Sequence, residues 1–266
     1  MNHFVLDAFK SYRSRLDDIL LIYELLEEIP QKMGLKVVMP PFVLPYYNGV
    51  VPEDCGISGF VFLAGGHFTI HTFSYREAYF ADLFYPEKFD SRSLEEALKD
   101  AFPAEKIESY CAVRGKNEAF PKTVKIDESV DFGPHLMIDY EEYTAPVSLD
   151  ELFDLFDGLP YKIGMTPIMR PYALKSKFQG QKVVSVMTMI AESHISLHCF
   201  PETGKAYFDI FSCRFFKFEE VAGKIKQGFK ALASKEIFIS RGSKYRHFRS
   251  TSDVQANKSR SWLENI

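Results

Sequence analysis

The sequence lacks long hydrophobic runs, and this absence sets the first limit on the class of protein. No apolar stretch reaches roughly 18 residues, so we expect no transmembrane helix. The first residues carry charges throughout, among them Lys10, Arg13 and Asp17, and therefore contain no apolar core of a signal peptide. We expect a protein without a membrane partner.

Cysteine is scarce, and positive charge is not in excess. The chain has four cysteines, Cys55, Cys111, Cys199 and Cys213. They form no Cys-X-X-Cys pair, which argues against zinc ribbons and thioredoxin-like motifs and favours a reducing, cytoplasmic location. The net charge is −4 with no long basic run, which argues against nucleic acid as a partner. His194 and His198 lack a carboxylate partner on their face, so we expect no metal site.

What the chain does contain is typical of a globular protein. Of its 266 residues, 46% are apolar and 26% are charged, and 25 are phenylalanine, which indicates a thick aromatic core. This length suits one large domain or two domains of about 130 residues.

The sequence is a doubled unit. Five segments recur in order: 3–7 as 135–139, 34–41 as 164–171, 66–73 as 193–200, 82–84 as 209–211, and 114–115 as 241–242. The offset falls from 130 to 127 after the second match, which places three extra residues of the first half near 52–54. Five ordered matches at nearly constant offset indicate a duplication.

Each half follows the same plan of strands and helices. The opening strands are expected at 4–9 and 136–140, and the last strands at 106–113 and 235–241. Three strand-like runs in each half are expected at 34–44, 58–73 and 78–85, and at 164–174, 184–200 and 205–213. A helix follows each opening strand, because apolar residues there recur at helical spacing, and a second helix precedes each last strand. Ser148 with Glu151, and Ser93 with Glu96, are expected capping boxes, and Gly158 an expected helix end.

This plan predicts an α+β fold of two related halves. Residues 1–115 form the first half, 116–133 a polar linker and 134–266 the second half. The second half ends in a polar tail from Arg249, whose Trp262 could dock on the folded part. Helices would cover one face of each mostly antiparallel sheet. The other faces would pack together into a four-layer αββα particle with a pseudo-twofold axis, as in a fused homodimer.

The two halves differ at a few chemically informative positions. Ser193 stands where the first half has Gly66, and Cys213 stands where it has Pro86. Taken singly, each would be an ordinary core residue. Their joint presence in one copy indicates one working site and one erased site.

The stretch from Ser185 to Cys213 resembles the bacterial-type, pyruvoyl-dependent S-adenosylmethionine decarboxylase family. It carries Glu-Ser-His at 192–194, a second histidine at His198, Phe-Pro-Glu at 200–202 and Phe-Ser-Cys at 211–213. The family pattern has Trp-Pro-Glu and Phe-Thr-Cys in the last two places. The chain thus resembles a tandem duplication of this family with a degenerate first half.

The resemblance implies that the protein makes its own cofactor. Ser193 would attack the carbonyl of Glu192, and elimination would split the chain into residues 1–192 and 193–266 with a pyruvoyl group in place of Ser193. Ser185 and His198 match the positions that assist this reaction. Strict strand alternation would place Ser193 and His198 on opposite faces, so a bulge or turn at 192–193 is required if they share one site.

The resemblance also implies roles in turnover. The pyruvoyl group would form a Schiff base with the substrate amine, and Cys213 would donate the proton after decarboxylation. Phe200 would stack on adenine, Glu202 would hold the ribose hydroxyls, and Ile195 would complete the substrate contacts. The first half's counterparts are interpreted as structural relics: Ser58, His67 and His71.

Three functions remain open. The first is an S-adenosylmethionine decarboxylase that supplies the aminopropyl donor for spermidine synthesis. The second is a pyruvoyl decarboxylase of another amino acid, ornithine or arginine, favoured if the first half supplies the ribose-binding position, where Tyr75 stands. The third is a non-catalytic regulatory partner of a decarboxylase, which would remain uncleaved. The expected partner is a small-molecule substrate, and the chain would be a monomer or a homodimer.

Overall fold

The computed structural model describes residues 1–46, 55–115, 125–191, 193–243 and 245. The expected insertion near 52–54, Glu192, most of the linker, and the tail with Trp262 lie outside these residues. Among the described residues, no helix is long and apolar enough to cross a membrane.

The first half folds into a six-stranded antiparallel sheet with strand order β2-β3-β4-β5-β1-β6. Its strands are β1 (Asn2–Ser11), β2 (Phe42–Tyr46), β3 (Gly56–Leu63), β4 (Gly66–Phe73), β5 (Ala78–Tyr85) and β6 (Ala104–Val113). Its helices are α1 (Arg13–Leu16), α2 (Ile19–Lys32) and α3 (Ser91–Ala101), with a 3-10 turn at Ser74–Arg76.

The second half repeats this topology, with strand order β8-β9-β10-β11-β7-β12. Its strands are β7 (Gly133–Glu141), β8 (Tyr172–Phe178), β9 (Gln181–Ile190), β10 (Ser193–Phe200), β11 (Lys205–Ser212) and β12 (Ala233–Arg241). Its helices are α4 (Leu149–Lys162) and α5 (Phe218–Gln227). The matching strand orders confirm the α+β class and the doubled fold.

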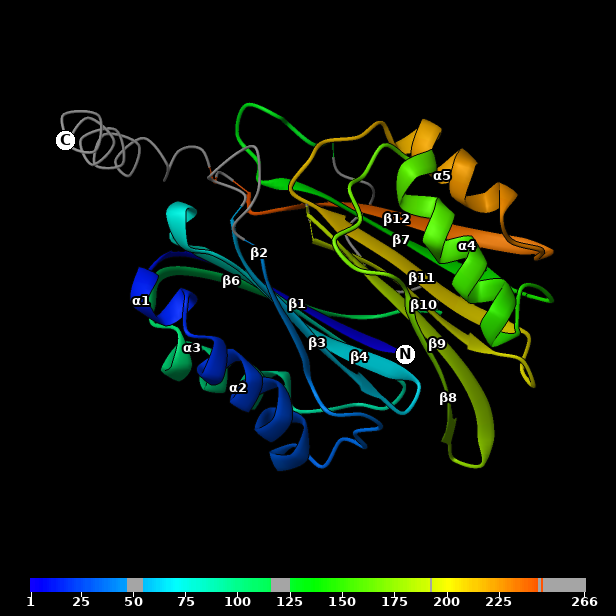
Figure 1. Ribbon diagram of the computed structural model, residues 1–266, viewed down its shortest axis with the longest axis horizontal. Coiled ribbons are helices and arrows are strands. Elements are labelled where there is room, and N and C mark those ends of the chain that lie inside the picture. Colours follow the sequence, from blue (N-terminus) through cyan, green and yellow to red (C-terminus); the bar gives the residue numbers. More distant parts are fainter. Residues whose placement is uncertain (47–54, 116–124, 192, 244, 246–266) are drawn as a thin grey trace.

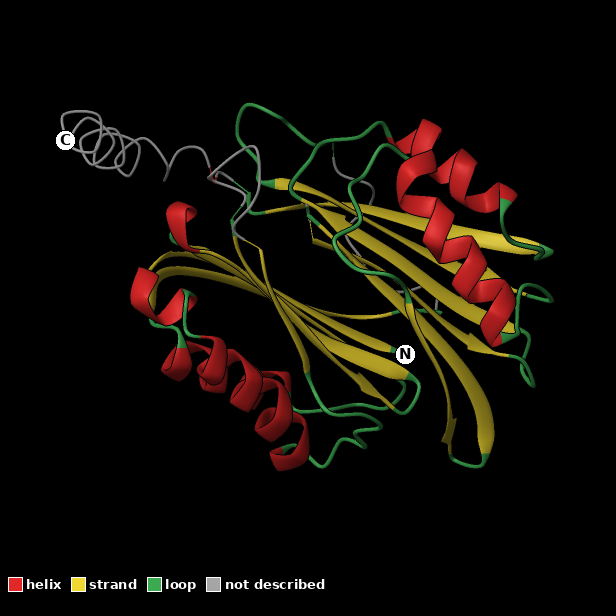
Figure 2. Cartoon of the chain, in the orientation of Figure 1, coloured by secondary structure: helices red, strands yellow, loops and turns green. Residues whose placement is uncertain are grey.

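The two sheets face each other, and the helices lie on the two outer faces (Figures 1 and 2). Each helix-facing side holds a large apolar cluster: Leu26, Phe68 and Leu94 belong to one, and Phe156, Leu197 and Ile225 to the other. The expected four-layer αββα arrangement is therefore present. Alternate residues of the same strands point into the space between the sheets, where the candidate site lies.

Several local expectations needed correction. The runs 58–73 and 184–200 are each two strands joined by a tight turn, because a two-residue connection suffices between antiparallel neighbours. The capping box of Ser148 and Glu151 is confirmed. The cap of α3 is Asp90, whose carboxylate accepts from the Ser93 backbone, so Ser93 lies inside the helix.

The end of α4 also differs from the prediction. Gly158 lies inside the helix, which continues to Lys162. The chain turns at Gly164, whose φ of +79° lies in the left-handed region that glycine adopts without a steric cost.

Candidate active site

Ser193 opens β10 directly after the turn that joins it to β9. It lies opposite Ile190 of β9 and Ser212 of β11. A turn lies at Ala191, whereas the bulge or turn expected if Ser193 and His198 share a site was placed at 192–193, where Glu192 lies outside the described residues. Ser193 has a φ of 153°, a value rare outside glycine, and only 1% of its surface is exposed. Within the described residues its Oγ makes no hydrogen bond. A buried, strained and unpaired serine is a candidate nucleophile.

Cys213 lies at the same end of the sheet as Ser193. It follows Ser212, the direct cross-strand partner of Ser193, so the two residues are one step out of register. Cys213 is half-buried and packs against an aromatic cluster that includes Phe80 and Phe211. We call this end of the sheet, which holds Ser193 and Cys213, the Ser193 end.

The structure does not bring Ser185 and His198 to Ser193. Ser185 Oγ and His198 Nδ1 are hydrogen-bonded at 2.8 Å. However, His198 lies five positions along β10 from Ser193, a separation of about 16 Å at roughly 3.3 Å per residue. The His198 ring packs against Phe62 and Phe84. The turn at Ala191 does not shorten this distance, so the expected grouping of these two residues with Ser193 is corrected.

The first half supplies a Ser–His pair near Ser193 instead. Ser58 Oγ lies 2.9 Å from His71 Nδ1. His71 Nε2 lies 2.8 Å from Nδ1 of His194, the residue next to Ser193, and the two rings stack at 5.0 Å and 6°. The sequence contains this pair as the repeat partner of Ser185 and His198, but only the packing of the two sheets shows that each pair crosses to the other half.

The predicted substrate-binding residues are also placed elsewhere. Phe200 ends β10, about 23 Å from Ser193 at the same rise per residue, and Glu202 lies in the turn beyond it. A Cβ on Gly65 would come within 3.1 Å of the Phe200 ring, and one of the ring's neighbours is Phe84. Phe200 therefore lies at the opposite end of the sheets, where Gly66 and Pro86 stand at the repeat positions of Ser193 and Cys213. We call this the Gly66 end.

The remaining predicted contacts lie in two different places. The Glu202 carboxylate accepts from the backbone N–H of Lys182 at 3.3 Å. Ile195 lies two positions from Ser193 on β10, and its side chain packs in the apolar core of the second half.

Aromatic side chains occupy the Ser193 end where the prediction placed Phe200 and Glu202. The repeat partners of those residues are Phe73 and Tyr75. Phe73 belongs to the aromatic cluster, in which the Phe80 and Phe132 ring centres are 4.1 Å apart. The Tyr75 side chain is 46% exposed and lies under the Arg13 guanidinium. No carboxylate replaces Glu202 at that repeat position.

Between the two ends lies a buried polar network built by both halves. Its members form six repeat pairs: His3 and His135, Asp7 and Asp139, His67 and His194, His71 and His198, Asp82 and Asp209, and Arg114 and Arg241. The two arginines cross between the sheets: Arg114 Nε donates to Asp139 at 2.7 Å, and Arg241 Nε donates to Asp7 at 2.6 Å. These ion pairs explain the repeated Arg-Gly motif.

Burial and charge set the protonation states in this network. Burial lowers the pKa of His135 to about 4 and that of His198 to about 3, and it holds the pKa of His71 well below its usual value. Burial alone would raise the pKa of Asp209. The neighbouring His135 and His194 rings outweigh it and hold that pKa well below the ordinary range. The network therefore contains neutral imidazoles beside an ionised carboxylate.

Two groups in the network have ligand atoms within 4.8 Å of one another: His3, His135 and Asp209, and His67, His194 and Asp209. Arg114 lies 3.3 Å from His3 Nδ1 and Arg241 lies 3.0 Å from His135 Nδ1. Because a guanidinium only donates, those neutral imidazoles carry their proton on Nε2 and offer no lone pair there. The donor set fits a hydrogen-bonded network better than a metal centre.

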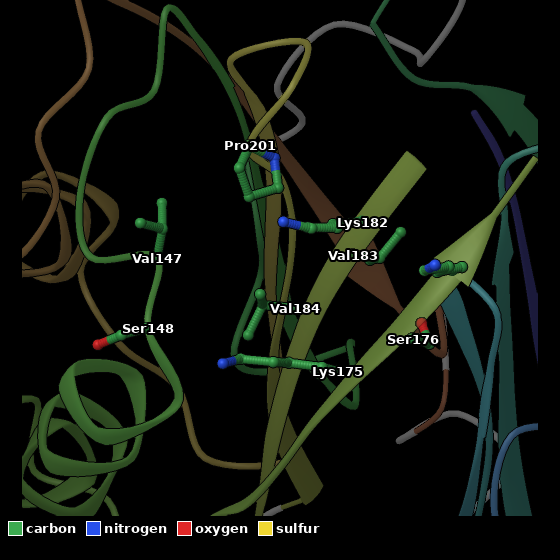
Figure 3. Close-up of a pocket in the computed structure, with 9 residues that line it drawn as sticks. Val147, Ser148, Lys175, Ser176, Lys182, Val183, Val184 and Pro201 are labelled. Atoms are coloured by element: carbon green, nitrogen blue, oxygen red, sulfur yellow. The ribbon is translucent and has the colours of Figure 1, made fainter. Parts of the chain in front are cut away.

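A separate cavity of about 580 Å³ lies between the segment that precedes α4, at Val147 and Ser148, and the β8–β9 hairpin. Figure 3 shows the Lys175 and Lys182 side chains extending toward Val147 across it. Neither Ser193 nor Cys213 lines this cavity. We therefore do not assign it to the candidate active site.

The fold and site define a duplicated two-sheet protein with one candidate self-processing serine. The family model described as "S-adenosylmethionine decarboxylase" matches residues 2–115 and 134–242. Because these two matches span most of the chain, the protein belongs to the S-adenosylmethionine decarboxylase family as a tandem duplication.

Individual relatives match one unit at a time. The chain is 31% identical over 116 residues to the S-adenosylmethionine decarboxylase proenzymes of Clostridium botulinum strains Langeland and Okra, covering 43% of this chain and 93% of each relative. The adenosylmethionine decarboxylase structure from Aquifex aeolicus matches 42% of this chain and 92% of its own, at 21% identity and a TM-score of 0.35.

Proposed function

We propose that the protein is a self-processing, pyruvoyl-dependent decarboxylase that acts on S-adenosylmethionine and supplies the aminopropyl donor for spermidine synthesis. The observation that carries the proposal is the strained, buried Ser193, which lies opposite Ser212, the last residue of β11 and the residue before Cys213. Family membership and the proenzyme relatives support it.

Ser193 is proposed as the self-cleavage residue. Its hydroxyl would attack the carbonyl of Glu192, moving the acyl group from nitrogen to oxygen. Elimination at Ser193 then releases the Glu192 carboxylate and leaves dehydroalanine, whose imine form is hydrolysed by water to the pyruvoyl group with release of ammonia. That group supplies an electrophilic carbonyl that accepts electrons when the substrate carboxylate leaves. Cys213 is proposed to hold the proton that replaces the carboxylate.

The purified protein tests this assignment directly. We expect two fragments that begin at Met1 and at the former Ser193, and intact mass measurement should show the pyruvoyl group on the second. Ser193→Ala should give one full-length chain. A wild-type chain that stays whole would instead support the non-catalytic regulatory role, and splitting of the alanine variant at the same bond would refute the serine mechanism.

For the assisting groups, we propose Ser58 and His71 in place of Ser185 and His198. The contact of His71 with His194 supports this choice, as does the distance of His198 from Ser193. Ser58→Ala and Ser185→Ala are matched variants, because each removes one hydroxyl from the same hydrogen bond in one half. We expect slow self-cleavage only for Ser58→Ala. The reverse result would restore the original grouping.

A decarboxylase of a smaller basic amino acid is the second candidate. Tyr75 stands where a ribose-binding carboxylate would be, and aromatic rings pack closely beside Cys213. Release of carbon dioxide from S-adenosylmethionine, ornithine and arginine in parallel separates the two candidates. We also propose a cytoplasmic monomer or homodimer. The described cysteines form no disulfide with one another, which is typical of a reducing compartment.

A further inference from the structure

One hydrogen-bonded chain runs from the first half into the second and ends at a carboxylate. Ser58 Oγ contacts His71 Nδ1, and His71 Nε2 contacts His194 Nδ1. His194 Nε2 lies 3.1 Å from Asp209 Oδ2, and Ser196 Oγ donates to Asp209 Oδ1 at 2.8 Å. All of these side chains are buried except that of Ser58, which is half-buried.

The carboxylate gives this chain a direction. Ionised Asp209 only accepts hydrogen bonds, so His194 donates from Nε2. In a neutral His194, Nδ1 then accepts from His71 Nε2–H. This leaves His71 Nδ1 unprotonated, and Ser58 donates its hydroxyl proton to it. Each group thus donates to the next one along the chain from Ser58 to Asp209. The unprotonated, basic nitrogen of His71 is therefore Nδ1, next to Ser58.

The equivalent chain at the Gly66 end has no such carboxylate. Ser185 contacts His198 Nδ1, and His198 Nε2 lies 2.8 Å from His67 Nδ1. Within the described part of the chain, His67 Nε2 makes no hydrogen bond. Asp82, the repeat partner of Asp209, accepts instead from Arg241 at 2.6 Å. The carboxylate-anchored chain is therefore present only beside Ser193.

We propose that Asp209 and His194 are positioning residues that hold His71 as the tautomer with Nδ1 unprotonated, and so make His71 the base for self-cleavage at Ser193. The second clause rests on the proposed function. In the acyl shift, Ser193 loses its hydroxyl proton and its peptide nitrogen gains one, so no other reactant is needed. His71, bonded to Ser58, would carry that proton between the two atoms.

Asp209→Asn tests the direction of the chain. The asparagine amide can donate to His194 Nε2. This would reverse the direction of each hydrogen bond back to His71 and place a proton on His71 Nδ1. Loss of the correct tautomer in a Ser-His-Asp triad costs about 10⁴-fold in rate, so we expect self-cleavage to slow by roughly 10²–10⁴-fold. The matched control is Asp82→Asn, which should split at close to the unmodified rate.

The tautomers can be measured without self-cleavage. In ¹⁵N-labelled Ser193→Ala protein, long-range ¹⁵N–¹H spectra should show His71 and His194 each protonated at Nε2 only. This measurement stands even if Asp209→Asn fails to fold. Adding Asp209→Asn should move the His71 proton to Nδ1.

The outcomes separate this inference from the proposed function. A His71 protonated at Nδ1 in the Ser193→Ala chain, a doubly protonated His194, or equal slowing by Asp82→Asn would overturn the positioning role. An unsplit wild-type chain with the expected tautomers would refute the proposed function and still support the assignment of the tautomers.

Discussion

At the residue scale, side chains of the same type have different roles in the two halves because their hydrogen-bond partners differ. His67 and His194 are repeat partners, yet only His194 is hydrogen-bonded to a carboxylate. The reason is that Asp82 is bound by Arg241 at 2.6 Å, whereas Asp209 lies 3.7 Å from Arg114 and remains available to His194. Residue type alone would assign both histidines the same role.

Cys213→Ala should separate self-cleavage from turnover. The thiol is proposed to act only after the pyruvoyl group exists, so the variant should still split into two fragments. Loss of a positioned proton donor typically lowers the rate about 10²–10⁴-fold. The rate of carbon dioxide release with the best substrate measures this effect. The mass of the fragment 193–266 shows whether its pyruvoyl group has been transaminated. A wild-type rate would remove Cys213 from the mechanism.

At the scale of single elements, β10 is shared between two ends of the molecule. Its first residue, Ser193, lies at the Ser193 end, and its last, Phe200, lies at the Gly66 end. A strand of eight residues spans about 26 Å, so a motif that is continuous in sequence is divided in space. The matching strand β4 carries Phe73 to the Ser193 end in the opposite direction.

The helix caps make a testable pair at this scale. Ser148 caps α4 by accepting from the Glu151 backbone, whereas Ser93 lies inside α3 and is capped by Asp90. Ser148→Ala should lower the free energy of unfolding by about 1 kcal/mol. Ser93→Ala should change it by less than about 0.5 kcal/mol. Urea unfolding in the Ser193→Ala background measures both, and equal effects would contradict the assigned caps.

At the scale of the whole molecule, duplication encloses the polar network between two sheets, and only one end carries the serine and the cysteine proposed for self-cleavage and turnover. Gly66 has no hydroxyl to attack a peptide bond, and Pro86 has no thiol. The duplicated chain therefore retains the architecture of a two-unit protein with one candidate centre.

One pyruvoyl group per chain is the expected consequence. Titration of the carbonyl with phenylhydrazine should reach a value near one for the cleaved protein. The Ser193→Ala chain serves as the blank, since it has no serine at either repeat position. A value near two would show that the first half is also processed.

The buried histidines should make the joined halves sensitive to acid. Burial depresses the pKa of His135 to about 4 and of His198 to about 3, below the unfolded value of about 6.5. The unfolded chain therefore binds more protons below pH 6.5, and stability falls as the pH falls. Each of these two groups should cost about 2 kcal/mol between pH 7.5 and pH 5 if it titrates alone.

Urea unfolding of the Ser193→Ala chain at both pH values measures this loss. Burial raises the pKa of Asp7, so protonation of this group at low pH favours the folded state. This single group is outweighed by the several buried histidines. A chain that is equally stable or more stable at pH 5 would contradict the protonation states assigned to the network.

The sequence by itself determined the duplication and the α+β class, and it singled out Ser193 and Cys213 as candidate site residues. Those features depend on repeats and on local periodicity, which any single chain displays directly. The capping box of Ser148 could also be predicted from the sequence, because its two partners are only three residues apart.

Only the tertiary structure decided which Ser–His pair contacts His194, the residue next to Ser193. Spacing along β10 suggested His198, but an extended strand separates residues five apart by about 16 Å, and a turn before the strand cannot bring them together. The sheets pack face to face with their strands related by a pseudo-twofold, so each half's pair lies against the other half. Contacts across such an interface follow from packing and carry no fixed separation in sequence, which is why His71 was interpreted as a relic until the sheets were seen together.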